Sequence, residues 1–232
     1  MKSVSILTYT RGTAGSDDKL RETARHYQTA WSTAVAHVGG DISFENVTGV
    51  SQDTWLEADA EGNLVVLARN NKGVTADDRR RLGVTNEMRL GEMVNRIRSV
   101  SIDSFSPTAP VIPKAFLSTV DGSIYLFGFM TNHHSTNLLQ LQEALVPYVQ
   151  SLGHIPWKTY RAFKNQVREA EEPFRFVDGE LIEAFLDLSP ELQQEVVNKA
   201  VGLIKAVDKD NKGTNDDVGW VKNLVEQLRR LH

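Results

Sequence analysis

The sequence predicts an α+β fold in which an antiparallel β-rich part precedes a helical part. In the first part, two hairpin-type turns, Glu61-Gly62-Asn63 and Asp121-Gly122, each lie between apolar runs. From Asn132 onward the apolar residues recur at helical spacing instead. This change of period divides the chain into residues 1–131, expected to form strands, and residues 132–232, expected to form helices.

The expected strands combine alternating or continuous apolar residues with flanking turn residues. They are residues 4–8, 31–38, 54–57, 63–69, 115–120 and 124–129. Residues 10–18 are rich in Gly, Ser, Thr and Asp, and residues 101–113 contain three prolines, so both are expected to be connections rather than strands. Thr75 and Asp78 resemble a capping box and predict a short helix that continues to Leu82.

The second part contains several helix start and stop signals. A helix with Leu138, Leu141 and Leu145 on one face is expected to begin at Ser135 or Thr136 and to end near Pro147. Further helices are expected from Pro156 to Val167, after Asp178 as N-cap, after Ser189-Pro190, and from residues 214–217 onward.

Composition and charge exclude several classes of protein. The net charge of −4 does not favour bulk binding of nucleic acid, and the run Arg79-Arg80-Arg81 directly follows two aspartates, as in a solvated helix face. The absence of cysteine excludes disulfides, thiolate zinc sites and a cysteine nucleophile. No apolar run approaches the roughly 20 residues of a membrane span, and no secretory signal is expected at the N-terminus.

The motifs that could carry chemistry are incomplete. Residues 208–213 resemble the start of a calcium loop, but Lys212 and Gly219 occupy ligand positions that require oxygen. His133 and His134 are adjacent, so they do not point to one metal ion, and no hydrolase elbow or phosphate-binding loop is present in the sequence. We therefore expect no catalytic residues, no metal and no cofactor.

The four tryptophans leave two interpretations open, because large aromatic residues occupy both cores and interface hot spots. Two alternative functions also remain. The chain could be a small hydrolase or metal enzyme that uses His133 and His134, or a self-contained β-sandwich that binds a partner. The strand count is too small for a complete propeller, and an incomplete one would leave unpaired sheet edges.

Four segments resemble one known family. They are residues 24–35, which include Arg25 and Trp31, residues 90–95 (LGEMVN), residues 119–124 (TVDGSI) and residues 176–188 (FVDGELIEAFLDL). In this order and spacing they resemble the C-terminal part of damage-specific DNA-binding protein 1-like adaptors of cullin-RING ubiquitin ligases. That family also contains the cleavage and polyadenylation specificity factor A subunits.

The resemblance implies that residues 1–131 form the last blades of a third β-propeller, which is incomplete here, and that residues 132–232 form an all-α domain. It also implies a non-enzymatic scaffold that acts in the DNA-damage response, mainly in the nucleus, and that binds helical segments of substrate receptors. The missing propeller blades of a longer chain would be a further partner. Direct contact of this part with nucleic acid is not expected, and the alternative within the family is a scaffold for RNA processing or heterochromatin.

The family resemblance also assigns a partner-binding groove. Its residues in this chain are Lys2, Arg25, Trp31, Met93, Asn95 and Phe127. Three of these depart from the family pattern, because Lys2 replaces arginine, Met93 replaces phenylalanine and Phe127 replaces valine. Methionine keeps the groove apolar and adaptable, whereas phenylalanine adds bulk.

Overall fold

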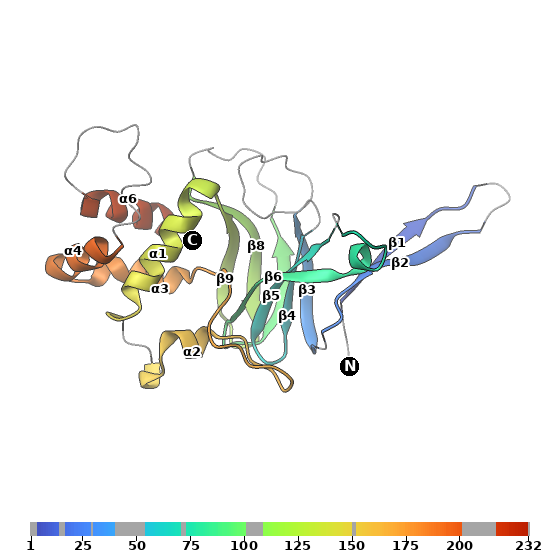
Figure 1. The fold of residues 1–232 in the computed structure, drawn as a ribbon, viewed down its shortest axis with the longest axis horizontal. Helices are drawn as coiled ribbons and strands as arrows, with labels where there is room; N and C mark the ends of the chain where they lie inside the picture. Colours follow the sequence, from blue (N-terminus) through green and yellow to red (C-terminus); the bar gives the residue numbers. More distant parts are fainter. Residues whose placement is uncertain are drawn as a thin grey trace.

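The structure is a computed structural model that describes residues 4–13, 17–28, 30–39, 54–70, 73–100, 109–149, 152–200 and 217–231. Antiparallel sheets occupy the middle of the molecule, helices gather at one end, and a β-hairpin projects from the other (Figure 1). Lys2 and the calcium-like loop 208–213 lie outside the described residues. Among the described residues, no helix is long and apolar enough to cross a membrane.

The described strands form three antiparallel sheets in which consecutive strands pair in chain order. The first is β1 (Ser5–Thr10) with β2 (Lys19–Arg25), the second is β3 (Ser32–Gly39), β4 (Thr54–Asp59), β5 (Asn63–Arg69) and β6 (Leu82–Arg89), and the third is β7 (Val94–Ser99), β8 (Val111–Thr119) and β9 (Ile124–Met130). A four-stranded meander flanked by a two-stranded and a three-stranded one is consistent with consecutive propeller blades.

The two predicted hairpins are confirmed. β4 and β5 join through Gly62, whose φ is 81°, and β8 and β9 join through Gly122, whose φ is 95°. Both values lie in the left-handed region, which glycine adopts at little cost. At Gly62 an added Cβ would also lie 3.1 Å from backbone atoms of Gly91 and Glu92, so this turn packs closely against the start of the next blade.

Three strands are absent from those expected, because their sequences are polar: β2, β6 and β7 (VNRIRS). β2 (KLRETAR) and β6 (LGVTNEMR) carry charged residues, and Leu82 begins β6 instead of ending a helix. The Thr75 capping box does form, since Asp78 N donates to Thr75 Oγ1 and Thr75 N donates to Asp78 Oδ2, at 3.0 and 3.2 Å. It opens only the short 3-10 helix η1 (Asp78–Arg80).

The prediction that residues 101–113 form only a connection is wrong at its end, because β8 begins at Val111 and contains Pro113. The neighbouring strand β7 pairs with β8 only as far as Ala115, and the β8–β9 register shifts between Pro113 and Ala115. Pro113 therefore lies at a bulge of the β8–β9 ladder, a position that strands tolerate for proline.

The helices lie beside the third sheet (Figure 1). They are α1 (Asn132–Leu145), η2 (Leu152–His154), α2 (Trp157–Arg161), α3 (Gly179–Glu183), η3 (Ala184–Asp187), α4 (Pro190–Lys199) and α6 (Asp217–Arg229). Leu138, Leu141 and Leu145 are buried as predicted, and α1 ends just before Pro147. It begins earlier than predicted, however, with Thr131 as N-cap.

Three apolar clusters hold these layers together. One lies between the four-stranded and three-stranded sheets and includes Leu56 and Ala115, and a second lies between the hairpin base and the four-stranded sheet. The third packs α1, α3, α4 and α6 around Phe185, and Val111 and Met130 of the third sheet lie against it. The helices thus continue the apolar interior of the last sheet.

The part after residue 131 is not all helical. α2 ends at Arg161, so the helix predicted as far as Val167 is wrong. Residues 162–178 form a non-helical segment that we call the strap, and it includes a small hairpin in which Lys164 and Glu169 pair. The strap runs along the outer edge of β6, where Glu87 and Phe174 exchange backbone hydrogen bonds of 3.0 and 2.8 Å. It covers an edge that would otherwise expose unpaired backbone groups.

Candidate partner-binding surface

The connection between β2 and β3 is anchored at both ends by one buried carboxylate. Glu57 of β4 is 1% exposed, and its Oε2 lies 3.2 Å from Nδ1 of His26, at the start of the connection. Its Oε1 accepts a hydrogen bond from the hydroxyl of Ser32, at the end of the connection. A buried carboxylate needs such partners, so this contact fixes where the connection leaves and rejoins the sheets.

Trp31 lies on this connection and is largely exposed to solvent. Its side chain is 71% exposed, although tryptophan is normally among the more buried residues. The backbone at this position is held, because Ala60 N donates to Trp31 O at 2.9 Å. The exposed ring is therefore presented from a fixed backbone, as in an interface anchor.

The start of β7 lies next to the start of β3. Thr33 Oγ1 donates to Val94 O at 2.6 Å, which joins the two sheets directly beside Met93 and Asn95. Met93 is half-buried and Asn95 is exposed, with Asn95 Oδ1 accepting from Ser118 Oγ at 3.2 Å. The structure thus places the β3 residues that follow Trp31 beside Met93 and Asn95.

Glu92 fixes the turn that leads into β7. Its carboxylate accepts hydrogen bonds from Thr119 Oγ1 and Tyr125 Oη at 2.7 and 2.8 Å. These hydrogen bonds lower the pKa of Glu92 below 4.5, and Arg161 nearby adds to the effect. Burial, followed by the hydrogen bond to Glu92, raises the pKa of Tyr125 from 10.0 to about 12. Around neutral pH Glu92 is therefore ionised and Tyr125 is protonated, so the phenol can donate to the carboxylate.

Arg25 lies at the other end of the β2–β3 connection from Trp31. Its guanidinium is exposed and pairs with Glu22, at 2.5 Å from Nη2 to Oε2, and it also donates to Ser5 Oγ at 3.2 Å. The side chain is therefore positioned on the surface by its own strand and by β1.

Phe127 lies in the core and not on the surface. It is 7% exposed and packs against the rings of Phe129 and Phe176, with centroids 5.5 and 6.2 Å away. Its bulk fills the space between the third sheet and the strap. Of the residues assigned to the groove, the described structure thus leaves Arg25, Trp31, Met93 and Asn95 at least partly accessible.

The comparisons with known proteins agree with this architecture. The sequence model of the family described as the CPSF A subunit region matches residues 1–187. The chain belongs to this family. The DNA damage-binding protein 1a of Arabidopsis thaliana is 32% identical over 234 residues, and DNA damage-binding protein 1 of Schizosaccharomyces pombe is 30% identical over 237 residues.

Each of these comparisons covers 100% of the chain but only 19% of the relative. The chain thus spans about a fifth of the length of the relatives it matches. The resemblance found from the sequence segments is confirmed at the level of the family.

A buried ionic cluster within the family-matched region was missed by the sequence interpretation. Asp178 occupies the predicted N-cap position of α3, but its side chain makes no cap hydrogen bond. Instead Asp178 Oδ2 accepts from Arg161 Nε at 2.7 Å and from Trp157 Nε1 at 3.0 Å. Arg161 also donates to Leu90 O, directly after β6, at 2.7 Å, so the cluster joins the helices to the sheets.

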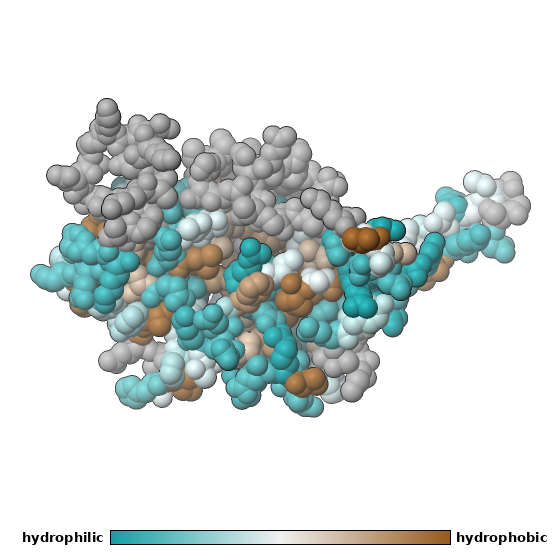
Figure 2. Space-filling model, in the orientation of Figure 1, coloured by the Kyte–Doolittle hydropathy of each residue, from teal (hydrophilic) through white to brown (hydrophobic). Residues whose placement is uncertain are grey.

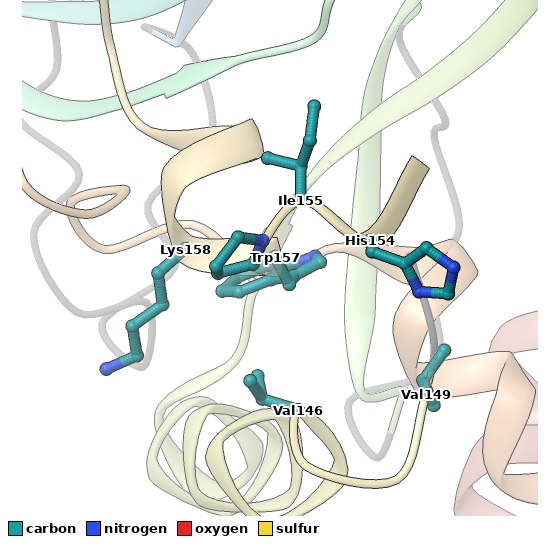
Figure 3. Close-up of a pocket in the computed structure, with 7 residues that line it drawn as sticks. Val146, Val149, His154, Ile155, Trp157 and Lys158 are labelled. Atoms are coloured by element: carbon teal, nitrogen blue, oxygen red, sulfur yellow. The ribbon is translucent and has the colours of Figure 1, made fainter. Parts of the chain in front are cut away.

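An open apolar pocket of about 380 Å³ lies at the end of α1. Figure 3 shows Val146 and Val149 on one side and Trp157 and His154 on the other, with Lys158 extending away from the centre. Lys158 is engaged by Glu143 and Glu172, at 3.0 and 2.9 Å. This lining provides no paired nucleophile and base.

The described residues contain no group of three or more histidines and acids that could hold a metal ion. His134 lies in the first turn of α1, and the calcium-like loop is outside the described part.

Proposed function

We propose that this chain is part of an adaptor scaffold of its family and that it binds helical segments of partner proteins at the surface around Trp31, Met93 and Asn95. The observation that carries the proposal is the 71% exposure of Trp31 on a connection anchored by Glu57. An exposed tryptophan on a held backbone loses little conformational entropy when a partner covers it. We also propose that the chain has no enzymatic activity of its own.

The chemistry of the neighbouring residues suits an apolar helix face. Met93 is half-buried and flexible, so it can adapt to different side chains, and Asn95 offers an amide at the edge of the same region. Arg25 supplies a positive charge at the opposite end of the connection. An amphipathic helix could place its apolar face on Trp31 and Met93 and its polar rim beside Asn95 and Arg25.

The names of the relatives suggest the cellular setting. They are DNA damage-binding proteins. We propose that this chain acts in a cullin-RING ubiquitin ligase in the nucleus, where its partners are substrate receptors. The description of the matching family model supports an alternative role in an RNA-processing or heterochromatin scaffold. Affinity purification of the tagged chain tests this choice, because ligase subunits and polyadenylation subunits are distinct sets of partners.

The remaining blades of a longer protein are a further proposed partner. β1 and β2 form a two-stranded sheet whose residues Leu7, Tyr9 and Leu20 are each more than half exposed. An isolated two-stranded hairpin is at best marginally stable in water, and further strands would cover these side chains. We therefore expect that the hairpin packs on inner strands contributed by sequence beyond this chain.

A peptide-binding experiment tests the proposed groove. The probe is a labelled helix-loop-helix peptide from a substrate receptor, titrated with the 232-residue chain and followed by fluorescence anisotropy. We expect Trp31→Ala to weaken binding at least about tenfold, as for an interface hot spot. Phe174→Ala is the matched control, because Phe174 is 49% exposed but lies on the strap, at the other edge of the second sheet. Equal affinity of the Trp31→Ala and wild-type chains would overturn the proposal.

A further inference from the structure

An arginine-rich surface lies beside the β2–β3 connection. Arg25 and Arg81 are neighbours in an isolated parallel bridge between the end of β2 and the residue before β6. The guanidinium carbon of Arg81 lies 5.5 Å from the ring centroid of Tyr27. Bridge partners in a sheet project to the same side, so Arg25 and Arg81 share one face, and Tyr27 lies against Arg81. We call Arg25, Tyr27, Arg80 and Arg81 the arginine surface.

The charges of this surface are only partly compensated. Arg25 pairs with Glu22, and Arg79 is used internally because its Nη1 donates to Gly73 O at 3.0 Å. Arg80 and Arg81 are both exposed, and neither forms a salt bridge with any residue of the described part of the chain. Asp78 interacts electrostatically with Arg81, but its carboxylate also accepts a hydrogen bond from Thr75 Oγ1 at 2.7 Å.

The geometry at Arg81 leaves its donors available. A guanidinium that stacks on an aromatic ring uses its flat face and keeps its N–H groups at the edge. Those N–H groups form a fork that matches a carboxylate. Tyr27 is 63% exposed, so both the ring and the edge of the guanidinium can be reached from solvent.

We infer that the arginine surface binds an acidic segment of a protein partner through Arg81, with Tyr27 holding the guanidinium in place. This inference rests on the proposed function for the identity of the partner, since the β2–β3 connection leads from Tyr27 directly to Trp31. A helix bound at Trp31 would then continue into, or be preceded by, glutamates or aspartates that reach Arg81.

A nucleic acid fits this surface less well than an acidic peptide. The chain has a net charge of −4, and Asp77 and Asp78 flank the arginines. A phosphate backbone requires positive charges spread along a stripe, whereas the arginines here form one short cluster with acids beside them. Figure 2 shows hydrophilic residues around η1 and the base of the β1–β2 hairpin, together with a small hydrophobic patch.

The test uses two versions of one amphipathic helical peptide, one ending in a run of glutamates and the other in glutamines. Both are titrated with the 232-residue chain at low and high salt. We expect the glutamate version to bind about fivefold more tightly at low salt, as for one or two exposed ion pairs, and this advantage to shrink at high salt. Arg81→Gln should abolish the advantage and leave the affinity for the glutamine version unchanged.

The matched control is Arg175→Gln, which removes another arginine stacked on an exposed ring, 5.7 Å from the centroid of Phe174 on the strap. It should keep the glutamate advantage. An advantage that survives Arg81→Gln, or none in the wild-type chain, overturns the inference. So does a single-stranded oligonucleotide that binds more tightly than the glutamate peptide and depends on Arg81.

The same titrations separate this inference from the proposed function. If Trp31→Ala does not weaken the glutamine version, the proposed groove fails. A peptide that consists of glutamates and has no apolar face then still tests the arginine surface by itself. Binding of this peptide should depend on Arg81 and not on Trp31.

Discussion

The imidazole of His26 lies 3.2 Å from the carboxylate of Glu57, and both side chains are buried. The contact links the end of β2 to the middle of β4, 31 residues along the chain. The same carboxylate accepts a hydrogen bond from Ser32, so a single side chain of the second sheet holds both ends of the connection that carries Tyr27 and Trp31. The surface proposed to bind partners therefore depends on a residue that a partner does not touch.

Glu57→Ala should destabilise the chain by about 1–3 kcal/mol, because it leaves the buried imidazole of His26 and the half-buried hydroxyl of Ser32 without this partner. The loss should be greatest locally. We expect faster hydrogen exchange at the Ala60 amide, which donates to Trp31 O, together with a lower free energy of unfolding in denaturant.

Two matched variants accompany this measurement. Glu57→Gln keeps an oxygen for Ser32 and an amide for His26, so it should retain most of the stability. Glu61→Ala removes an exposed acid from the neighbouring turn and should have little effect. If Glu57→Ala behaves like Glu61→Ala, the carboxylate does not anchor the connection.

Asp178→Ala should be among the most damaging single substitutions, at about 3–5 kcal/mol, because it leaves the buried Arg161 guanidinium with only the exposed carboxylate of Glu180 as counter-charge. Arg161 and Asp178 have side chains that are 6% and 8% exposed. Equilibrium unfolding in urea provides the measurement, and Asp187→Ala in the exposed part of η3 provides the control. A loss below about 1 kcal/mol for Asp178→Ala would mean that the cluster contributes little.

The parts of the fold that the sequence predicts are those specified by neighbouring residues. Gly62 and Gly122 mark their hairpins because few other residues adopt a positive φ, and Ser189 caps α4 by accepting from Leu192 N at 3.4 Å. The same holds for the buried face of α1, since its leucines recur at the helical period.

The parts that the sequence does not predict depend on distant contacts. The strap reads locally as the end of a helix, but Asn63 Nδ2 donates to Lys164 O and Lys164 N donates to Asn63 Oδ1, across 101 residues. Such contacts outweigh the weak local preference for helix. They also hold the strap against the second sheet, where Arg168 pairs with Glu87.

The candidate site also depends on distant contacts that the local sequence does not predict. Phe127 is buried against Phe176, whereas Trp31 is exposed to solvent. Nothing in the local sequence distinguishes these two kinds of aromatic residue. Glu57 gives no sequence signal either, because an acid in a strand is usually solvated.

Phe127→Ala should therefore affect mainly stability, and Trp31→Ala mainly partner binding. Phe127→Ala should lower the free energy of unfolding by about 3–5 kcal/mol, since it opens a cavity between the third sheet and the strap. Trp31→Ala should change the free energy of unfolding by no more than about 0.5 kcal/mol while weakening partner binding. Circular dichroism during urea unfolding gives the first quantity, and anisotropy titration gives the second. A large loss of stability in Trp31→Ala would assign Trp31 to packing instead.

The contact between Tyr125 and Glu92 predicts a loss of stability in alkali. The folded chain holds the pKa of Tyr125 at about 12, above its ordinary value of 10.0, so folding favours the protonated phenol. The resulting stabilisation is complete below pH 10.0 and is lost as the pH rises from there to about 12.

Tyr125→Phe should remove this pH dependence, whereas Tyr27→Phe, at an exposed position, should not. Glu92→Gln should lower the pKa of Tyr125 only in part, because burial is the larger cause of its rise. Ultraviolet absorbance of tyrosinate, measured alongside the unfolding free energy at each pH, tests both statements. A Tyr125→Phe chain that loses stability over the same interval as the wild-type chain would show that another group titrates there.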